Sequence, residues 1–329
     1  MLKSHWLYIF AVITGFFVLI AALVLLAIAL IYPKLPDLNA LTDYRPKIPM
    51  RVYTIDGALL AEFGEERRAV VDLAHTPKIL QQAILAAEDD RFYQHGGIDT
   101  MGVLRAAMSN VVSGGAKEGA STITMQVARN FFLSSEKTFT RKLNEALLAI
   151  KIERSLSKDQ ILTLYINQIY LGQRAYGFAA ASQAYFGKPL RKIDIAEAAM
   201  LAGLPKAPSR YNPVVNLPRA QARQHYVLHR MYELHYIDAD QYNAALNEPL
   251  IIRKNQMSNI QVGADYVAEM IRQAMYDRYQ DAIYTNGLKV YTTLRKKDQR
   301  MADTALWQGV ETYDHRHGYR GAEGIASLP

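Results

Sequence analysis

Residues 76–97 read TPKILQQAILAAEDDRFYQHGG, an apolar helical pattern that runs directly into a cluster of acids. A Thr-Pro pair is typical of a helix start, and apolar side chains follow it at helical spacing. The pattern predicts a helix that ends at Glu88, with Asp89 and Asp90 directly behind it. Negative charge is unfavourable at a helix C-terminus, so this cluster indicates a function at the helix end.

Glu88 is the candidate acid/base group of the cluster. Its neighbours Ile84 and Ala87 are apolar, and burial among them would raise the pKa of the carboxyl group. The alternative is a solvated acidic helix end that pairs with Arg91. His95 lies in a Gly-containing turn without a second ligand at helical spacing, so the sequence predicts no metal site there.

A second informative stretch, GASTITMQ, occupies residues 119–126. Ser121 is expected to cap a helix that begins at Thr122, which would turn backbone N–H groups toward an anion. Thr122, Thr124 and Gln126 add side-chain hydrogen-bond donors. A capped helix with a threonine-rich first turn and no ligand would have the same sequence.

A third cluster combines Arg141, Lys142 and Glu145 on one helix face. By itself it is typical of a surface salt bridge. Beside Gln126 and Arg129 it could instead form a cationic wall for a pyrophosphate. Glu145 would then orient the bases or hold a divalent metal ion.

The bulk composition limits the function classes. The chain has 329 residues, half of them apolar, which is enough for about two domains. It contains no cysteine, which excludes disulfides, thiolate zinc sites and cysteine nucleophiles. The net charge of +7 indicates ordinary surface basic residues or an anionic partner, such as lipid head groups or a phosphorylated substrate. Nucleic acid is not expected as a partner outside the cytoplasm.

Residues 6–32 form an uncharged apolar run, WLYIFAVITGFFVLIAALVLLAIALIY. The run is long enough to span a bilayer and has aromatic residues near its ends. A cleaved signal peptide is the alternative, but its apolar part would be shorter and a small-residue cleavage site would follow. We therefore expect a transmembrane anchor at 6–32, a cytoplasmic tail at 1–5 and the remainder outside the cytoplasm.

The rest of the chain divides into a linker and two regions. A Pro-containing linker at 33–49 precedes a predicted hairpin, which turns at Asp56-Gly57 between Met50–Ile55 and Ala58–Phe63. Further helices are predicted near 98–112, 122–132, 136–155, 158–170, 176–186, 194–204, 218–235 and 238–246, with Ser157 and Asp194 as caps and Pro218 as an opening residue. We expect one mainly α domain over 50–247.

From residue 248 to 329 the sequence changes character. A β-rich segment at 287–294 is followed by a helical pattern near 297–312. This region is expected to be a linker and the incomplete beginning of a second domain.

Five short patterns occur in order between residues 88 and 208. They are E-D-x-x-F-x-x-H-x-G at 88–97, G-x-S-T-I-T-Q-Q at 119–126 with Met125 as a departure, R-K-x-x-E at 141–145, K-x-x-I-L-E-x-Y-L-N-x-x-x-x-G at 158–172 with Thr163 and Ile166 as departures, and A-x-x-L-A-G-x-P-x-x-P at 198–208. Together they resemble the family-51 peptidoglycan glycosyltransferases, the lysozyme-like domain of class A penicillin-binding proteins of the 1a type. The resemblance covers roughly residues 50–247.

The resemblance implies an enzyme that polymerises lipid II into β-1,4 glycan strands and releases undecaprenyl pyrophosphate. It implies Glu88 as the general base and Glu145 as a second catalytic group, which could also bind Mg²⁺ or Mn²⁺. The implied substrate-binding residues are Asp89, Ser121, Thr122, Gln126, Arg129, Arg141, Lys142 and Asn167.

The resemblance also implies a location and partners. The protein would be a single-pass protein of the bacterial inner membrane with its catalytic domain in the periplasm. Its partners would be lipid II, the growing glycan strand, membrane lipids and other cell-wall synthesis proteins.

A second activity is implied for the full-length protein, which would also be a DD-transpeptidase. Two S-x-x-K matches, Ser134–Lys137 and Ser155–Lys158, lack the S-x-N and K-T-G motifs that a transpeptidase needs. Residues 318–322 resemble the beginning of the domain inserted in the 1a type. The transpeptidase site is therefore expected outside this chain.

Other interpretations stay open. The apolar stripe within 101–118 is equally typical of a core helix and of a mobile lid that dips into the membrane. A lysozyme-like lytic enzyme would share the helical fold and the glutamate at a helix end. A non-catalytic cell-wall scaffold would not need both Glu88 and Glu145.

Overall fold

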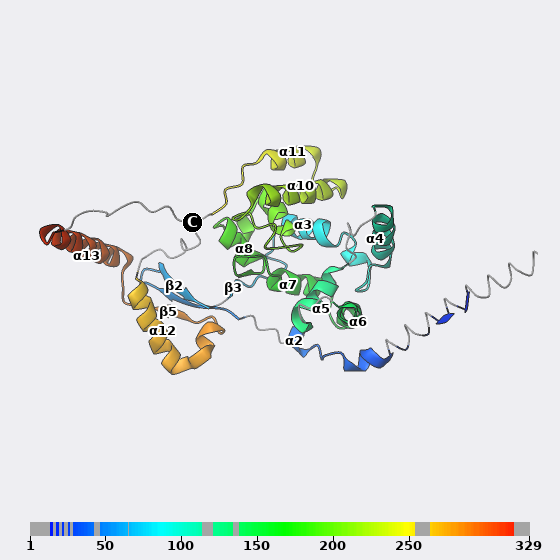
Figure 1. The fold of residues 1–329 in the computed structure, drawn as a ribbon, viewed down its shortest axis with the longest axis horizontal. Coiled ribbons are helices and arrows are strands. Elements are labelled where there is room, and N and C mark those ends of the chain that lie inside the picture. The colour runs from blue at the N-terminus through cyan, green and yellow to red at the C-terminus, as the bar shows by residue number, and fades with distance from the viewer. Residues whose placement is uncertain are drawn as a thin grey trace, which may run out of the picture. The chain divides into compact units, whose positions relative to one another are not determined.

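The computed structural model describes residues 14–15, 18–19, 22, 26, 29–42, 47–64, 66–113, 121–133, 138–253 and 264–318. The chain forms two compact units, each made of two chain segments. The first unit combines Met1–Arg45 with Ala69–Ile252, and the second combines Pro46–Arg68 with Arg253–Pro329. Figure 1 labels their elements.

The first unit is helical, as the sequence predicts. Its elements are η1 Tyr32–Lys34, α2 Asn39–Thr42, α3 Lys78–Glu88, η2 Phe92–Gln94, α4 Thr100–Ser113, α5 Ile123–Phe132, α6 Phe139–Ser155, α7 Lys158–Gln168, β4 Ala175–Tyr176, α8 Phe178–Tyr185, η3 Leu190–Lys192, α9 Ile195–Gly203, α10 Leu217–Glu233 and α11 Ala239–Asn247. Each predicted helix is present, with its ends shifted by a few residues. The mainly α fold class is confirmed for this unit.

Local sequence sets several helix starts. α7 follows Ser157, whose hydroxyl accepts from the N–H of Gln160 while the Gln160 side chain accepts from the N–H of Ser157. Asp194 caps α9 in the same way. At α3 the structure differs from the prediction, because Pro77 takes the cap position and the Thr76 hydroxyl donates to a carbonyl four residues earlier.

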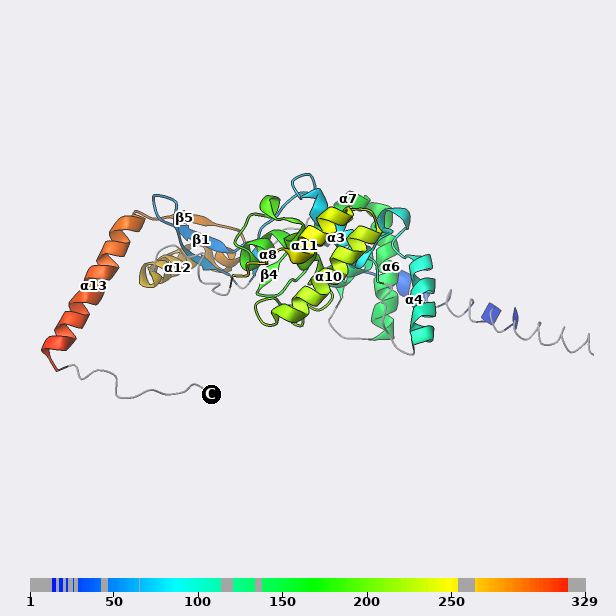
Figure 2. The same cartoon turned by 90° about the horizontal axis from the view of Figure 1, so that it is seen from above.

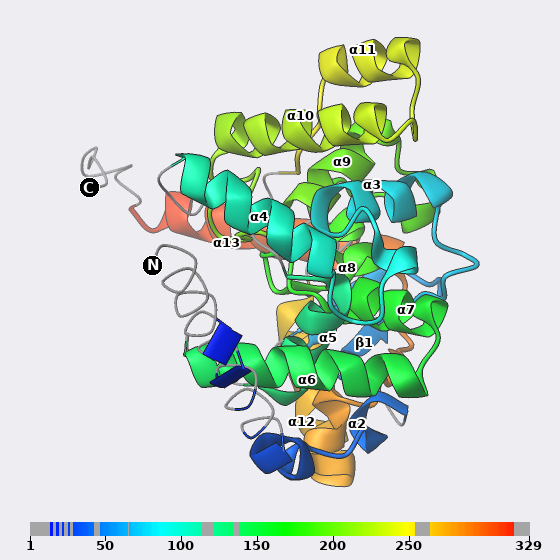
Figure 3. The same cartoon turned by 90° about the vertical axis from the view of Figure 1, so that its right-hand side faces the viewer.

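α9 lies inside the first unit, and its small side chains let other helices approach closely. All residues from Ala196 to Gly203 are buried. α3 and α10 both pack on α9 and on each other, as Figure 3 shows, while α5 packs on α6 and α7. Leu80 and Ile84 of α3 are fully buried, and each such side chain contributes about 2 kcal/mol. This packing fixes the C-terminal end of α3.

The second unit contains a three-stranded sheet. β1 Met50–Tyr53 pairs antiparallel with β2 Leu59–Phe63 and parallel with β5 Lys289–Tyr291. The predicted hairpin and the predicted β segment are therefore confirmed. Gly57 has a φ of 79°, a left-handed conformation that suits glycine in a tight turn.

A helix that the sequence analysis did not predict, α12 Asp265–Tyr279, packs against β2, and Figure 2 shows it beside the sheet. Ala268 is buried, and Val267, Ile271 and Met275 are partly buried against the same cluster. Their spacing of three and four residues is the helical signal that was missed. The short elements β3 Arg67–Arg68 and η5 Gln280–Tyr284 complete this unit apart from its last helix.

The unit boundaries differ from the domain boundaries expected from sequence. The hairpin at 50–63 was assigned to the glycosyltransferase domain, but it belongs to the same compact unit as residues 253–329. The physical reason is β5, which hydrogen-bonds to β1 and shares a core with Met50, Val52 and Leu60.

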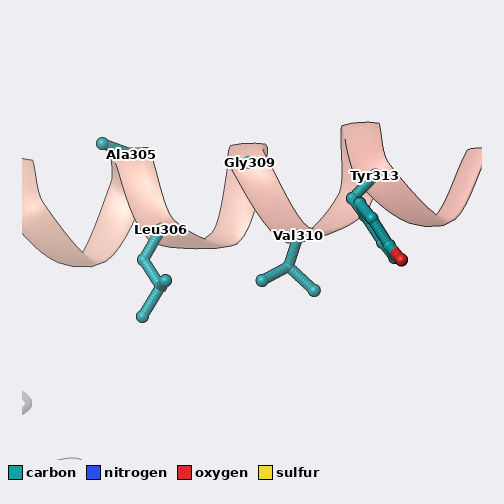
Figure 4. A pocket seen from close by; sticks show the side chains of 5 residues that line it. All are labelled: Ala305, Leu306, Gly309, Val310 and Tyr313. Carbon is teal, nitrogen blue, oxygen red and sulfur yellow. The ribbon is translucent and has the colours of Figure 1, made fainter. Parts of the chain in front are cut away.

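The last helix, α13 Lys296–Arg316, has no buried residue. Figure 4 shows Leu306, Val310 and Tyr313 on this helix, where they line a shallow apolar hollow with Ala305 and Gly309. The predicted helix near 297–312 is confirmed.

Several expectations fall on residues that the structure does not describe. They concern Ser134–Lys137, most of residues 318–322, the glycine-rich segment 114–120 and most of the anchor at 6–32. Among the described residues, no helix combines the length and the apolar character needed to cross a membrane.

Candidate active site

Glu88 closes α3 with its carboxyl group turned into the protein. Although the residue as a whole is partly exposed, Oε1 is shielded from solvent and has no hydrogen-bond partner among the described residues. Oε2 accepts a 2.6 Å hydrogen bond from Nε2 of Gln126. Burial raises the pKa of Glu88 above its ordinary value, and the hydrogen bond from Gln126 opposes this rise. Three cations oppose it further, namely Arg223, Arg129 and Lys206.

The carboxylate of Asp89 joins the acid cluster to α5. Oδ2 accepts a 3.0 Å hydrogen bond from the N–H of Ile123, the first residue of α5. Both oxygens also lie within 3.1 Å of Nε2 of His95, whose side chain is buried. Asp89 thus holds two motifs together, and the substrate contact implied for it stays a prediction.

The other charges of the cluster pair differently from the expectation. Arg91 does not neutralise the acids behind α3 but pairs with Asp99, with Nε 3.3 Å from Oδ2. Asp90 accepts a 2.9 Å hydrogen bond from Arg230 of α10. The unfavourable charge at the end of α3 is therefore balanced by α10, which lies far from α3 along the chain but packs against it.

Thr122, and not Ser121, caps α5. Its Oγ1 accepts from the N–H of Met125 at 3.2 Å and donates to the carbonyl of Gly97 at 2.6 Å. Gly97 has a φ of 91°, and a Cβ there would lie 2.9 Å from the backbone of Ala149. Two N–H groups at the start of α5 thus have partners within the protein. The N–H of Ile123 donates to Asp89, and the N–H of Met125 donates to Thr122. The capping residue predicted at Ser121 is therefore wrong, and the anion contact predicted for this helix start stays a prediction.

Ser121 and Glu145 meet at Lys142. Nζ of Lys142 donates to Oγ of Ser121 and to Oε2 of Glu145, each at 2.7 Å. Nε of Arg141 lies 3.4 Å from Oε1 of Glu145. Glu145 has only 1% of its side chain exposed, whereas Lys142 has 43%. The alternative of a solvated surface salt bridge is therefore wrong, and Lys142 remains accessible to an anion from solvent.

A family model described as Transglycosylase matches residues 56–232, more than half of the chain. The chain belongs to the transglycosylase family. Penicillin-binding protein 1A of Neisseria meningitidis is 53% identical over 328 residues, which cover 100% of this chain and 41% of that protein. Penicillin-binding protein 1A of Pseudomonas aeruginosa is 49% identical over 291 residues, covering 88% of this chain and 35% of that protein.

Among solved structures, the crystal structure of penicillin-binding protein 1A from Haemophilus influenzae aligns with a TM-score of 0.49 and 34% identity. The alignment covers 87% of this chain and 33% of that one. The chain spans 41% of the length of the Neisseria meningitidis relative.

The first three transglycosylase motifs form one connected set of contacts. Gln126 reaches Glu88, and the start of the same helix reaches the neighbouring aspartate. Ser121, just before that helix, reaches Lys142 and through it Glu145. The sequence predicted these residues at one site, and the structure brings them together.

Two further predicted residues of the transglycosylase site, Arg129 and Asn167, lie outside this set of contacts. Arg129 lies on α5 one turn after Gln126, where its charge acts on Glu88. Asn167 donates from Nδ2 to the carbonyls of Val71 and Thr163, and its Oδ1 accepts from the N–H of Val71 at 2.9 Å. Its amide thus connects segments 96 residues apart, and the substrate contact implied for it stays a prediction.

The sequence analysis did not identify a polar cluster in which Thr124 of α5 contacts Glu153 and Lys158. The hydroxyl of Thr124 donates to Glu153 at 2.6 Å, and Lys158 donates to the same carboxylate oxygen at 2.7 Å. Nζ of Lys158 also lies 4.3 Å from the ring centre of Phe92. Lys158 and Phe92 were visible as motif positions, but no pattern marked Glu153.

The donor set around Glu145 does not fit a metal ion held by the protein alone. Two cationic side chains already flank this carboxylate. Within the described parts of the chain, no three acidic or histidine side chains gather as metal ligands. A divalent cation would need further oxygen ligands from another molecule.

Proposed function

We propose that this protein polymerises a lipid-linked disaccharide, lipid II, by transglycosylation. The glycosyl bond to the lipid pyrophosphate breaks, and a β-1,4 bond forms to the incoming 4-hydroxyl with inversion at C1. Polyprenyl pyrophosphate leaves. The observation that carries this proposal is the buried Glu88 carboxyl group, which is linked through α5 to an accessible cation at Lys142.

Glu88 serves as the general base in this proposal. A sugar hydroxyl is a weak nucleophile and needs a positioned acceptor for its proton. The raised pKa of Glu88 lets the carboxylate take that proton and release it after the bond has formed. The amide of Gln126 holds Oε2 of Glu88 in place. Because the amide is neutral, it does not pair with the carboxylate as a cation would.

Lys142 and Arg141 serve the leaving group. Pyrophosphate gains negative charge as the glycosyl bond breaks, and cations placed beside it lower the barrier. Glu145 holds both cations at 3.4 Å or less, and Ser121 fixes the ammonium group of Lys142 from another side. Arg129 adds positive charge near the base.

A divalent cation, Mg²⁺ or Mn²⁺, is part of the proposal only together with the substrate. The pyrophosphate oxygens would complete a ligand set in which Glu145 is one protein carboxylate. Such a cation would supply further charge neutralisation to the leaving group.

The proposed site works at the surface of a bacterial inner membrane, on the periplasmic side. Four apolar residues of α4 are exposed, which leaves this helix with an uncovered face; they are Met101, Val103, Leu104 and Met108. This exposure favours contact with acyl chains over the alternative of a core helix. The apolar run at 6–32 would anchor the chain to the same membrane.

The direct test replaces Glu88 by Gln, which keeps the shape and can still accept from Gln126. Polymerisation of labelled lipid II should fall about a thousandfold, because the base is lost. Glu248→Gln, an exposed change behind α11, is the matched control and should leave the rate unchanged. Near-normal glycan formation by Glu88→Gln would refute the assignment. Release of soluble muropeptides from purified sacculi without lipid II would instead favour a lytic enzyme.

The whole protein is proposed to carry a second activity beyond these residues. The similar proteins are named penicillin-binding proteins, and they are more than twice as long as the matched region. We propose a DD-transpeptidase site in the remaining part. A fluorescent penicillin should acylate the full-length protein and leave residues 1–329 unlabelled; labelling of residues 1–329 would contradict this division.

A further inference from the structure

Arg223 of α10 is a buried cation without a carboxylate partner. Only 8% of the residue is exposed, and Nε is shielded from solvent without a hydrogen-bond acceptor. Within the described residues, the ion pairs of α10 are formed by His229 and Arg230 and not by Arg223. Burying an unpaired charge is costly, so this position requires a reason.

The fold makes room for this arginine. Gly203 ends α9, and a Cβ at that position would lie only 3.0 Å from Cγ of Arg223. The guanidinium group lies 4.4 Å from the ring centre of Tyr226, which follows about one turn later on the same helix. The side chain is therefore enclosed between α10 and the end of α9.

The same layer of helices contains the proposed base. α10 packs on both α3 and α9, whose C-terminal residues are Glu88 and Gly203 (Figure 3). Glu88 has a buried oxygen without a donor, and Arg223 has a buried nitrogen without an acceptor. Two complementary groups are thus buried in one set of packed helices.

Charged and titratable groups from several helices act electrostatically on the Glu88 carboxyl group or are influenced by it. The positive charges of Arg223 from α10, Arg129 from α5 and Lys206 after α9 act on Glu88, and Glu88 and Asp89 act on the buried hydroxyl of Tyr165 from α7. Burial raises the pKa of Tyr165 well above its ordinary value, so Tyr165 stays neutral. Among the cations, Arg223 opposes the raised pKa of Glu88 most strongly.

We propose that Arg223 is a positioning residue for Glu88, whose buried positive charge keeps the carboxylate ionised inside the protein. This inference rests on the proposed function, in which Glu88 must be ionised to accept a proton. It adds a role for α10, which contributes no residue to the base or the cationic clamp.

The first experiment measures the charge of Glu88 without any substrate. Unfolding midpoints of the 329-residue chain and of Glu88→Gln are compared across pH. Because the pKa of Glu88 is raised by folding, the parent should lose stability relative to Glu88→Gln as pH rises through that pKa. When Arg223→Gln is added to the parent and to Glu88→Gln, the loss of stability caused by Glu88 should extend to higher pH. An unchanged pH dependence would overturn the inference whether or not the chain polymerises lipid II.

The second experiment measures lipid II polymerisation. Arg223→Gln should lower the rate about tenfold at about pH 7 and restore it to within about threefold at about pH 9. Arg223→Lys should stay within about threefold of the parent throughout, because it keeps the charge. Arg219→Gln, exposed one turn earlier on α10, is the control and should match the parent. An equal loss at every pH would mean that Arg223 only supports packing, and would overturn the proposal.

Discussion

Glu88 and Glu145 both project from helices of one domain, and both bury carboxylate oxygen, yet their surroundings differ in kind. Glu88 receives one hydrogen bond from a neutral amide and leaves the other oxygen without a partner. Glu145 is enclosed by Lys142 and Arg141. The first environment suits a group that gains and loses a proton, and the second suits a fixed negative charge that holds two cations in place. The contrast teaches that charge partners, more than burial, separate the two roles.

After the loss of the base itself in Glu88→Gln, removal of the fixed charge of Glu145 gives the largest expected effect. Glu145→Gln should lower lipid II polymerisation about a hundredfold, because Lys142 and Arg141 lose the group that positions them. Glu311→Gln on the exposed helix α13 is the control and should not affect the rate. If Glu145→Gln were fully active, the cluster would serve only the fold.

Removing the neutral partner of Glu88 gives a smaller and pH-dependent effect. The hydrogen bond from Gln126 lowers the pKa of Glu88, so Gln126→Leu should raise it and leave more of the base protonated at neutral pH. The rate should fall about tenfold at about pH 7 and recover as pH increases. A loss that is independent of pH would indicate the contact with the donor pyrophosphate that the sequence analysis implied for Gln126.

The smallest effect on turnover is expected at Asn167, which belongs to neither environment. Asn167→Ala removes buried hydrogen bonds to Val71 and Thr163 and should reduce the free energy of unfolding by about 2 kcal/mol. Turnover per folded molecule should not change. Urea titration and lipid II kinetics measure the two quantities, with Asn243→Ala on the exposed face of α11 as control. A higher KM at unchanged stability would place Asn167 in the substrate site.

The helices could be predicted because their signals are local. Ser157 and Asp194 cap α7 and α9 as their sequences indicate, and apolar spacing located α3 to α11. α12 was missed although its spacing is helical, because the charged and tyrosine-rich segment lacks a strong cap. The grouping of the hairpin with β5 could not be predicted, because pairing over more than 200 residues leaves no local trace.

The sequence motifs predicted which residues belong to the site, but they did not predict the hydrogen-bond partner of each residue. Gln126 donates to Glu88, a partner that the sequence analysis did not predict, and its expected contact with the leaving group stays a prediction. Ser121 was expected to cap α5, but Thr122 does so and Ser121 accepts from Lys142. Such choices depend on distances between helices, which a linear pattern does not contain.

The hydrogen bond from the N–H of Ile123 to Asp89 has a consequence for inhibitor design. The start of α5 would otherwise attract a phosphate or carboxylate group of an inhibitor. Because the protein supplies its own carboxylate there, an anionic group aimed at this helix end would meet repulsion. A compound should gain more by directing its anion to the accessible ammonium group of Lys142.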